Sequence, residues 1–182
     1  MPLQTLEDVF NEQLKDVYSA ENQILKALPK MAKNASSPEL REAFEEHLEQ
    51  TREQVARLDR IMEMIGASGK GKKCKGMEGL LEEGKEVLEE KREASGSALD
   101  AAMIAAAQRV EHYEIAAYGS LCAYAKQLGN RDALALLKET LSEEEETDKR
   151  LTHIAGSVNL EAAAEQPERS SGRKSARTRT AR

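Results

Sequence analysis

The sequence predicts an all-α protein, and three observations lead to that prediction. The 182 residues include four prolines and no Trp, and aromatic residues make up 3% of the chain. A composition dominated by Ala, Leu, Glu and Lys favours helices over strands. Apolar residues recur every three or four positions along four long segments, as on the buried face of a helix. Helix-capping and turn residues separate these segments, for example at residues 36–38 and 129–130.

The first predicted helix covers about residues 5–35. Thr5 is a suitable N-cap, and Asp8 three positions later completes a capping box. Pro29 is expected to kink this helix and not to end it, because the apolar pattern continues beyond the proline. Glu21 stands in the middle of the apolar stripe. A carboxylate at such a core-facing position requires a partner, since burying an unpaired charge is costly.

The second predicted helix covers about residues 38–65. Ser37 is the expected N-cap, and Pro38 suits the first helical position. The apolar stripe of this helix is interrupted by His47 and Thr51, which lie one turn apart. Taken alone, His47 is more often a hydrogen-bonded histidine of the core or its edge than a metal ligand.

About thirty residues separate the second long helix from the third. Residues 66–75 are rich in Gly and Lys, but their order does not match a phosphate-binding loop and no strand precedes them. This argues against a nucleotide site. A short extra helix is predicted over residues 77–92.

The third long helix starts near Ser95 or Ser97 and stops before Gly129, which suits the left-handed position after a helix. Its core stripe is apolar except for Glu114. Glu111 lies one turn earlier at the edge of that stripe, where it fits the rim of the core and the surface equally well.

The fourth long helix is expected to run from its N-cap, Asn130, to about Gly156. Glu144 and Asp148 stand among its apolar positions. Residues 143–146 are all Glu, and by themselves they are typical of a solvated acidic face. The placement of Glu144 in the stripe sets it apart from its neighbours.

The first and second long helices are joined by a short connection, and so are the third and fourth. The connection between the second and the third is long. Two hairpins joined by one long crossover are typical of a ferritin-like four-helix bundle. The hairpins can be aligned so that Glu21 matches Glu114 and Thr51 matches Glu144, which indicates a weak internal repeat. We expect this bundle to span residues 1–158.

Residues 159–182 are expected to form a disordered basic tail, because they hold few apolar side chains to bury. Within them, residues 166–182 carry six basic residues and one acidic residue, a net charge of +5. The net charge of the whole chain is −6, so the other 165 residues carry a net charge of −11. Such a tail predicts weak, sequence-independent contact with nucleic acid or another anionic partner.

The polar interruptions are expected to meet at one level of the core and to bind metal. The candidate metal ligands are Glu21, His47, Glu111, Glu114, Glu144 and Asp148. Carboxylates in a low-dielectric interior repel one another, and no Lys or Arg lies on these stripes, so either protons or a cation must neutralise them. Oxygen-rich donors with an imidazole suit Fe or Mn. Two ions bridged by Glu21 and Glu114 would neutralise the set best. Tyr118, beside Glu114, is expected to pack and not to take part in redox chemistry.

The donor pattern departs from the di-metal plan of ferritin-like proteins. That plan uses one Glu from each of two helices and a Glu-x-x-His pair from each of the other two. Here Phe44 stands three residues before His47, and Thr147 stands three residues after Glu144. The sequence therefore leaves open whether one or two ions bind.

The chain shows no signal for export or membrane insertion. No apolar run approaches the roughly 20 residues needed to span a bilayer, and the N-terminus has neither a basic nor an apolar signal region. Cys74 and Cys122 lie in different segments and form no Cys-x-x-Cys motif. We expect a cytoplasmic protein with free thiols and no membrane partner.

Residues 3–158 resemble the YciF-like family of ferritin-like bacterial stress proteins. The motifs are Asp16-Val17-Tyr18-Ser19-Ala20-Glu21, Ser37-Pro38-Glu39-Leu40 with Phe44-Glu45-Glu46-His47, Cys74-Lys75-Gly76-Met77-Glu78-Gly79-Leu80, Arg109-Val110-Glu111-His112-Tyr113-Glu114-Ile115-Ala116-Ala117-Tyr118-Gly119, and Glu143-Glu144 with Thr147-Asp148-Lys149. More distantly, the plan is similar to rubrerythrin and manganese catalase. The resemblance implies a four-helix bundle, a homodimer, a di-metal site and a role in stress response. It implies no established reaction.

Two functions remain as alternatives at this point. In the first, a dinuclear iron or manganese site in the core reacts with peroxide or oxygen, as in an oxidase or peroxidase. In the second, the protein is a non-catalytic bundle whose basic tail contacts an anionic partner. Iron storage is a third possibility, which depends on assembly into a cage.

Overall fold

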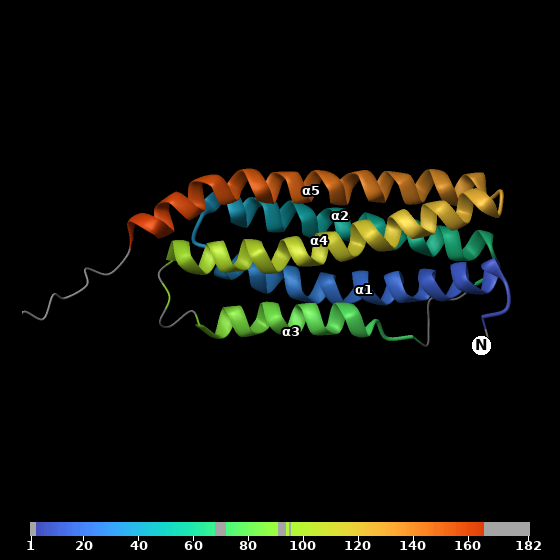
Figure 1. Cartoon of the computed structure of the whole chain (residues 1–182), viewed down its shortest axis with the longest axis horizontal. Helices are drawn as coiled ribbons and strands as arrows, with labels where there is room; N and C mark the ends of the chain where they lie inside the picture. The colour runs from blue at the N-terminus through green and yellow to red at the C-terminus, as the bar shows by residue number, and fades with distance from the viewer. Residues whose placement is uncertain (1–2, 68–71, 91–93, 95, 166–182) are drawn as a thin grey trace, which may run out of the picture.

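The computed structural model describes all residues except 1–2, 68–71, 91–93, 95 and 166–182, and over this part the chain is all-helical. The five helices there are α1 (Leu6–Asn34), α2 (Pro38–Met64), α3 (Lys75–Glu89), α4 (Gly96–Gln127) and α5 (Arg131–Ala164). The four long helices form a bundle, and the shorter α3 lies outside it against α4 and α1 (Figure 1). None of these helices is long and apolar enough to cross a membrane.

Local signals set the helix ends, largely as predicted. The Thr5 hydroxyl accepts a hydrogen bond from the Asp8 N–H, and the Asp8 carboxylate accepts one from the Thr5 N–H, which completes the capping box. Ser37 and Asn130 cap α2 and α5 with their side chains. Gly129 has φ of +71°, the left-handed conformation that glycine adopts without strain.

The last helix is longer than predicted. α5 continues past Gly156 to Ala164, so residues 159–164, which we expected in a disordered tail, are helical. Val158 is buried against the core, and packing of that turn stabilises the helix beyond the glycine. The remainder of the predicted tail, residues 166–182, lies outside the described part of the chain.

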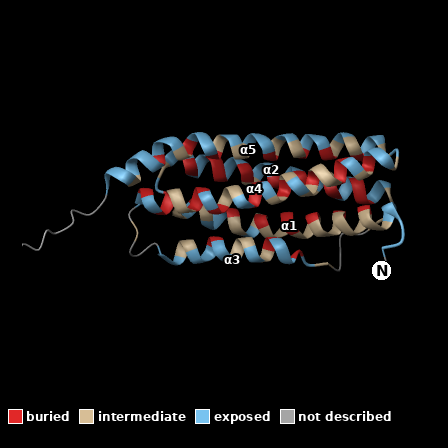
Figure 2. Ribbon diagram, viewed as in Figure 1, coloured by how far each residue is buried: buried red, intermediate tan, exposed pale blue. Residues whose placement is uncertain are grey.

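Two apolar clusters fill the bundle, one toward the α1–α2 turn and the other toward the α4–α5 turn. Between them, every long helix contributes buried polar side chains, and we call this set the polar layer. Its members are Glu21 of α1, His47, Thr51 and Gln54 of α2, Glu111 and Glu114 of α4, and Thr140 and Glu144 of α5. Figure 2 shows buried residues along the facing sides of the helices. The polar interruptions of the apolar stripes therefore do lie in the core, except Asp148, which is half-buried.

Hydrogen bonds of the Cys74–Leu80 motif hold α3 against the bundle. The Cys74 side chain caps α3, and the backbone N–H of Cys74 donates to the Ser19 hydroxyl of α1 at 2.9 Å. On α4, the Tyr113 hydroxyl lies 2.9 Å from Cys74 Sγ and donates to the Asp16 carboxylate at 2.6 Å. Burial raises the pKa of the Cys74 thiol, so it stays protonated and can donate to Tyr113.

Gly76 is needed where α3 meets α4. A Cβ at this position would lie 2.8 Å from the Tyr113 ring, closer than carbon atoms pack. The glycine therefore lets the aromatic ring lie against the first turn of α3. The short helix runs from Lys75 to Glu89 and begins earlier than the predicted residue 77, because Cys74 is its N-cap. The predicted end, residue 92, lies outside the described residues.

Candidate metal centre

Four buried side chains of the polar layer converge on one point. His47 of α2, Glu111 and Glu114 of α4, and Glu144 of α5 each offer a nitrogen or oxygen atom, and these atoms lie within 4.8 Å of one another. His47 Nε2 lies 3.5 Å from Glu111 Oε1. Glu111 and Glu114 are neighbours on α4 because residues three apart share a helix face. Three helices thus bring together four of the six predicted ligands.

Glu21, the fifth predicted ligand, is fully buried in the same layer but is held differently. Its Oε1 accepts a hydrogen bond from the Tyr118 hydroxyl of α4. The charge of Glu144 raises the pKa of Glu21, and the charge of Glu21 raises the pKa of Glu114. These interactions place Glu21 beside the four-residue cluster. Tyr118, expected to be a packing residue, therefore also donates a hydrogen bond in the core. The signal for its polar role was its spacing, one turn after Glu114.

Asp148, the sixth predicted ligand, lies outside the cluster. Its side chain is 21% exposed, and it accepts a hydrogen bond from Gln108 Nε2 at 3.0 Å. His112 Nε2 lies 3.5 Å from the same carboxylate on the surface of the bundle. Asp148 is one helical turn from Glu144 along α5, but the rotation of the helix turns it toward solvent between α4 and α5.

Two further polar residues of α2, which the sequence pattern did not single out, face α5. Gln54 is fully buried and donates to Glu143 Oε2 at 3.0 Å. Arg57 forms two hydrogen bonds with the Glu143 carboxylate and pairs with Glu139. Glu143 is therefore paired, whereas its neighbour Glu144 points into the core. Both α2 residues continue the spacing of His47 and Thr51, which was the available signal.

Burial and mutual repulsion raise the pKa of each carboxyl in the cluster. Desolvation, and then repulsion from Glu144, raises the pKa of Glu21 to about 8. Desolvation raises the pKa of Glu144 to about 7 and holds the pKa values of Glu111 and Glu114 well above 4.5. Desolvation lowers the pKa of His47 to about 4. Near neutral pH, the cluster therefore holds several protonated carboxyls beside a neutral imidazole.

Carboxyl–carboxyl hydrogen bonds link Glu111 with Glu144 and Glu114 with Glu21. Apart from these bonds, most donor atoms of the cluster and of Glu21 lack a hydrogen-bond partner among the described residues. They are Glu21 Oε2, His47 Nδ1 and Nε2, Glu111 Oε2, and both carboxyl oxygens of Glu114 and Glu144. Buried polar atoms are nearly always hydrogen-bonded in folded proteins, so this concentration requires an explanation. Neutral imidazole nitrogen and carboxylate oxygen are both ligands of Fe and Mn, and the donor set fits such an ion.

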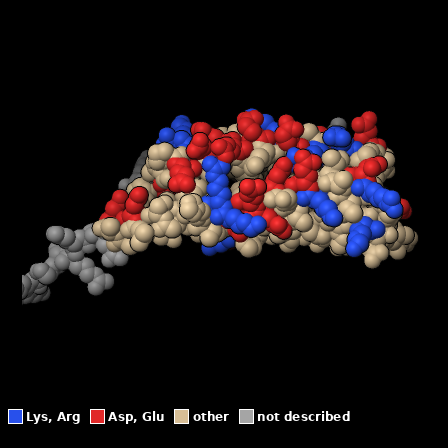
Figure 3. All heavy atoms as spheres, turned by 90° about the horizontal axis from the view of Figure 1, so that it is seen from above, with Lys and Arg blue, Asp and Glu red and all other residues tan. Residues whose placement is uncertain are grey.

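A cavity of about 220 Å³ between α2 and α5 reaches His47 and Glu111 from the surface. Glu46 and Glu146 line it, and Arg150 of α5 pairs with Glu46 across its mouth. Acidic side chains are numerous on the face of the molecule seen over α5 (Figure 3). The arrangement offers a cation a polar path to the cluster.

The fold and the site together define a class of protein. It is a bundle of long helices with a buried cluster of carboxylates and one histidine near the middle of the helices. The chain matches the family described as a domain of unknown function, DUF892, over residues 5–164, and it belongs to that family. It is 51% identical to the Escherichia coli protein YciF over 166 residues. This alignment covers 89% of the chain and 98% of YciF. The resemblance predicted from the motifs is confirmed.

Solved structures agree with this assignment. The crystal structure of the Escherichia coli stress protein YciF matches with a TM-score of 0.83 and 49% identity, over 86% of this chain and 98% of that chain. YcfI from Rhodopseudomonas palustris matches with a TM-score of 0.78 and 41% identity, over 82% of this chain and 94% of that chain. A Xanthomonas campestris protein with 20% identity and a TM-score of 0.69, over 86% and 94%, shares the fold.

Proposed function

We propose that this chain is a ferritin-like stress protein that binds iron or manganese in its polar layer. His47, Glu111, Glu114 and Glu144 would hold the first ion. Glu21 would bind a second ion together with Glu114, as in the dinuclear plan. The observation that carries the proposal is the group of buried donor atoms without hydrogen-bond partners. The similarity to a protein described as a stress protein supports the biological setting.

The residues around the cluster suit this role. A bound iron or manganese ion would supply redox chemistry with peroxide or oxygen. His47, neutral because its pKa is about 4, presents a lone pair without first losing a proton at pH 7. Tyr118 fixes the orientation of the Glu21 carboxyl. The apolar clusters on both sides limit contact of the layer with bulk water to the cavities beside His47 and Glu111. These apolar surroundings strengthen electrostatic attraction to a cation.

Asp148 is not part of the proposed ligand set, because its carboxylate is already bound by Gln108 at the surface. The homodimer and the nucleic-acid contact of the basic tail stay predictions.

The test is metal content per chain. The protein is purified without chelator, loaded anaerobically with Fe(II) or Mn(II), desalted and measured by plasma mass spectrometry. We expect about two equivalents of iron or manganese, or about one if Glu21 does not take part. A Glu145→Ala variant, which removes an exposed acid next to Glu144, serves as the control and should retain the metal. Absence of metal after loading would refute the proposal and would mean that protons alone neutralise the cluster.

A further inference from the structure

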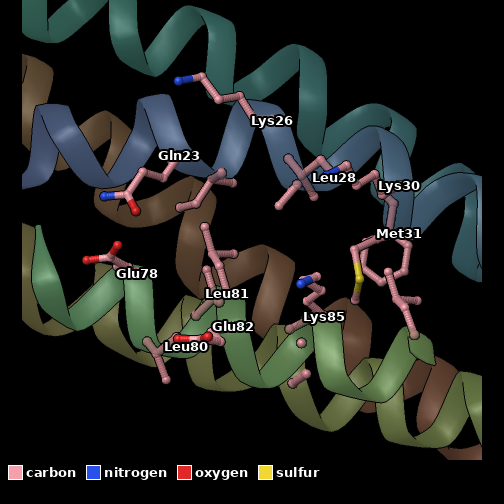
Figure 4. Close-up of a pocket in the computed structure, with 18 of the residues that line it drawn as sticks. Gln23, Lys26, Leu28, Lys30, Met31, Glu78, Leu80, Leu81, Glu82 and Lys85 are labelled. Atoms are coloured by element: carbon pink, nitrogen blue, oxygen red, sulfur yellow. The ribbon is translucent and has the colours of Figure 1, made fainter. Parts of the chain in front are cut away.

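A larger cavity, of about 430 Å³, lies between α1 and α3 and is not needed for a metal ion. Figure 4 shows Leu81 of α3 directed toward α1 in the middle of this space. At its inner end, the cavity reaches Phe44, His47 and Glu111, which also line the α2–α5 cavity. It approaches these residues from α1 and α3, whereas the smaller cavity approaches them from α2 and α5. Its volume falls in the range of roughly 300–1,000 Å³ that small-molecule sites occupy.

The size and lining of the cavity indicate an organic occupant. A water molecule takes about 30 Å³ of liquid, and peroxide or oxygen needs a comparable space, so neither calls for a cavity this large. The walls between mouth and inner end are mainly aliphatic. They include Ile24, Leu28, Leu80, Leu88, Ala107 and Val110. Such walls bind an apolar chain through the hydrophobic effect.

The charges at the mouth favour an anionic head group. Four lysines line the cavity, against two exposed or half-buried glutamates near the mouth, Glu78 and Glu82. Glu78 is already paired with Lys73 and Lys75, whose hydrogen bonds and charges lower its pKa to about 2. This pairing also neutralises Lys73, so it removes one of the four lysines from the charge balance at the mouth.

The cations on α1 are freer. Lys26 and Lys30 form no ion pair with any described residue, although Figure 4 shows the ammonium of Lys26 directed away from α3. Among the described residues, Lys85 of α3 pairs only with the exposed Glu89, at 3.5 Å. An exposed pair of this kind is weak and readily exchanged. Figure 4 shows Lys85 extending from α3 toward α1.

We propose that the α1–α3 cavity binds a free, single-chain aliphatic carboxylate. The chain occupies the apolar interior, with its end near Phe44 and Ala107, and the carboxylate lies among Lys30 and Lys85 at the mouth. The ligand then covers the side of His47 and Glu111 that faces α3. This binding goes beyond the proposed metal function and does not require it, because the cavity is complete without a metal ion.

The first experiment tests the location of the site. Binding of decanoate, below its micellar concentration, is measured by calorimetry on the full chain, both as purified and after metal loading. Ala107→Phe places a ring inside the cavity and should weaken binding by about tenfold or more. Ala105→Phe, two residues away on the exposed side of α4, is the matched control and should bind as the parent does. Ala27→Phe fills the cavity from α1 and serves if Ala107→Phe fails to fold.

The second experiment tests the head group. Decyltrimethylammonium, with the same chain and the opposite charge, should bind at least about tenfold more weakly than decanoate. Lys30→Glu and Lys85→Glu should each weaken decanoate binding by about threefold or more, whereas Lys33→Glu, on the same helix but outside the cavity, should not.

Each contrary result has a defined meaning. No saturable decanoate binding, or equal binding by Ala107→Phe, would overturn the site itself. Equal binding of the cationic amphiphile would overturn the carboxylate. Cosedimentation with phosphatidylglycerol vesicles that Ala107→Phe abolishes would identify a membrane lipid as the occupant in place of the free acid. Metal content is measured on the same samples, so a failure of the metal proposal is recognised separately.

Discussion

The α1–α2 hairpin and the α4–α5 hairpin contribute unequally to the polar layer, although sequence comparison aligns them. The first hairpin supplies Glu21, which accepts a hydrogen bond from Tyr118. The second supplies Glu111, Glu114 and Glu144, three of the four clustered donors. Where the second hairpin has Glu144, the first has Thr51, whose hydroxyl donates to the His47 carbonyl at 2.8 Å.

This difference shows two ways to accommodate polar groups in a helical core. The first hairpin satisfies only part of its polar groups with protein hydrogen bonds. Thr51 and Gln54 each donate one, whereas both His47 nitrogens have no partner among the described residues. The second hairpin places carboxyls where few partners exist, so protons or a cation must neutralise them. A metal site built this way depends mainly on α4 and α5, and changes in each hairpin should have different consequences.

The largest effect is expected from Glu114→Ala, which removes a carboxyl at the centre of the cluster. The variant should lose nearly all bound metal, measured by plasma mass spectrometry. At pH 8, where Glu144 is charged and Glu21 partly so, its metal-free form should be as stable as the parent or more stable in chemical denaturation, because repulsion among buried acids is relieved. Full metal content in this variant would show that the ligand assignment is wrong.

Next in size is the pH dependence of the metal-free protein. Carboxyls with raised pKa keep their protons in the folded chain at a pH where the unfolded chain has lost them, so they stabilise the fold most below pH 4.5. That stability is lost as the pH rises toward the folded pKa values, which are about 7 for Glu144 and about 8 for Glu21.

The effect of His47 on stability has the opposite sign. Because its pKa is lowered to about 4, its contribution to stability rises with pH, but only between about pH 4 and 6.5. Between pH 6.5 and 8, the melting temperature of the metal-free protein should therefore fall by on the order of 5–10 °C in calorimetry. Glu114→Gln should reduce this fall. Metal affinity should rise over the same interval, because the ligands bind as carboxylates. A melting temperature that rises from pH 6.5 to 8 without metal would contradict the raised pKa values.

Thr51→Glu makes the first hairpin more like the second. The new carboxyl would enter the polar layer beside His47, and the second equivalent of metal should bind about tenfold more tightly at pH 8. Thr51→Gln, of equal size and without charge, is the control for changes in packing. Equal metal affinity in the two variants would show that position 51 does not face the ions.

The smallest effect is expected from Tyr118→Phe, which removes the hydrogen bond that holds Glu21. Loss of this bond should destabilise the protein by about 1–2 kcal/mol in urea unfolding. Because the Tyr118 hydrogen bond lowers the pKa of Glu21, its loss should also move uptake of the second ion to higher pH. Tyr124→Phe, on the same helix and outside the polar layer, should change neither property.

Much of the fold and part of the site could be predicted from the sequence. Caps at Thr5, Ser37 and Asn130 depend on hydrogen bonds between residues three apart, which a short segment determines by itself. The period of apolar residues identified Glu21 and Glu114 as buried, because a helix face is fixed by sequence spacing alone.

Contacts between helices were decided only in the tertiary structure. Glu144 and Asp148 share one sequence pattern, yet only Glu144 faces the cluster, since the rotation of α5 against α4 and α2 determines which of them is covered. The same holds for the pairing of Tyr118 with Glu21 and of Cys74 with Tyr113, and for the cavity under α3. Spacing along one helix fixes a direction around its axis, but the partner found in that direction depends on how neighbouring helices pack.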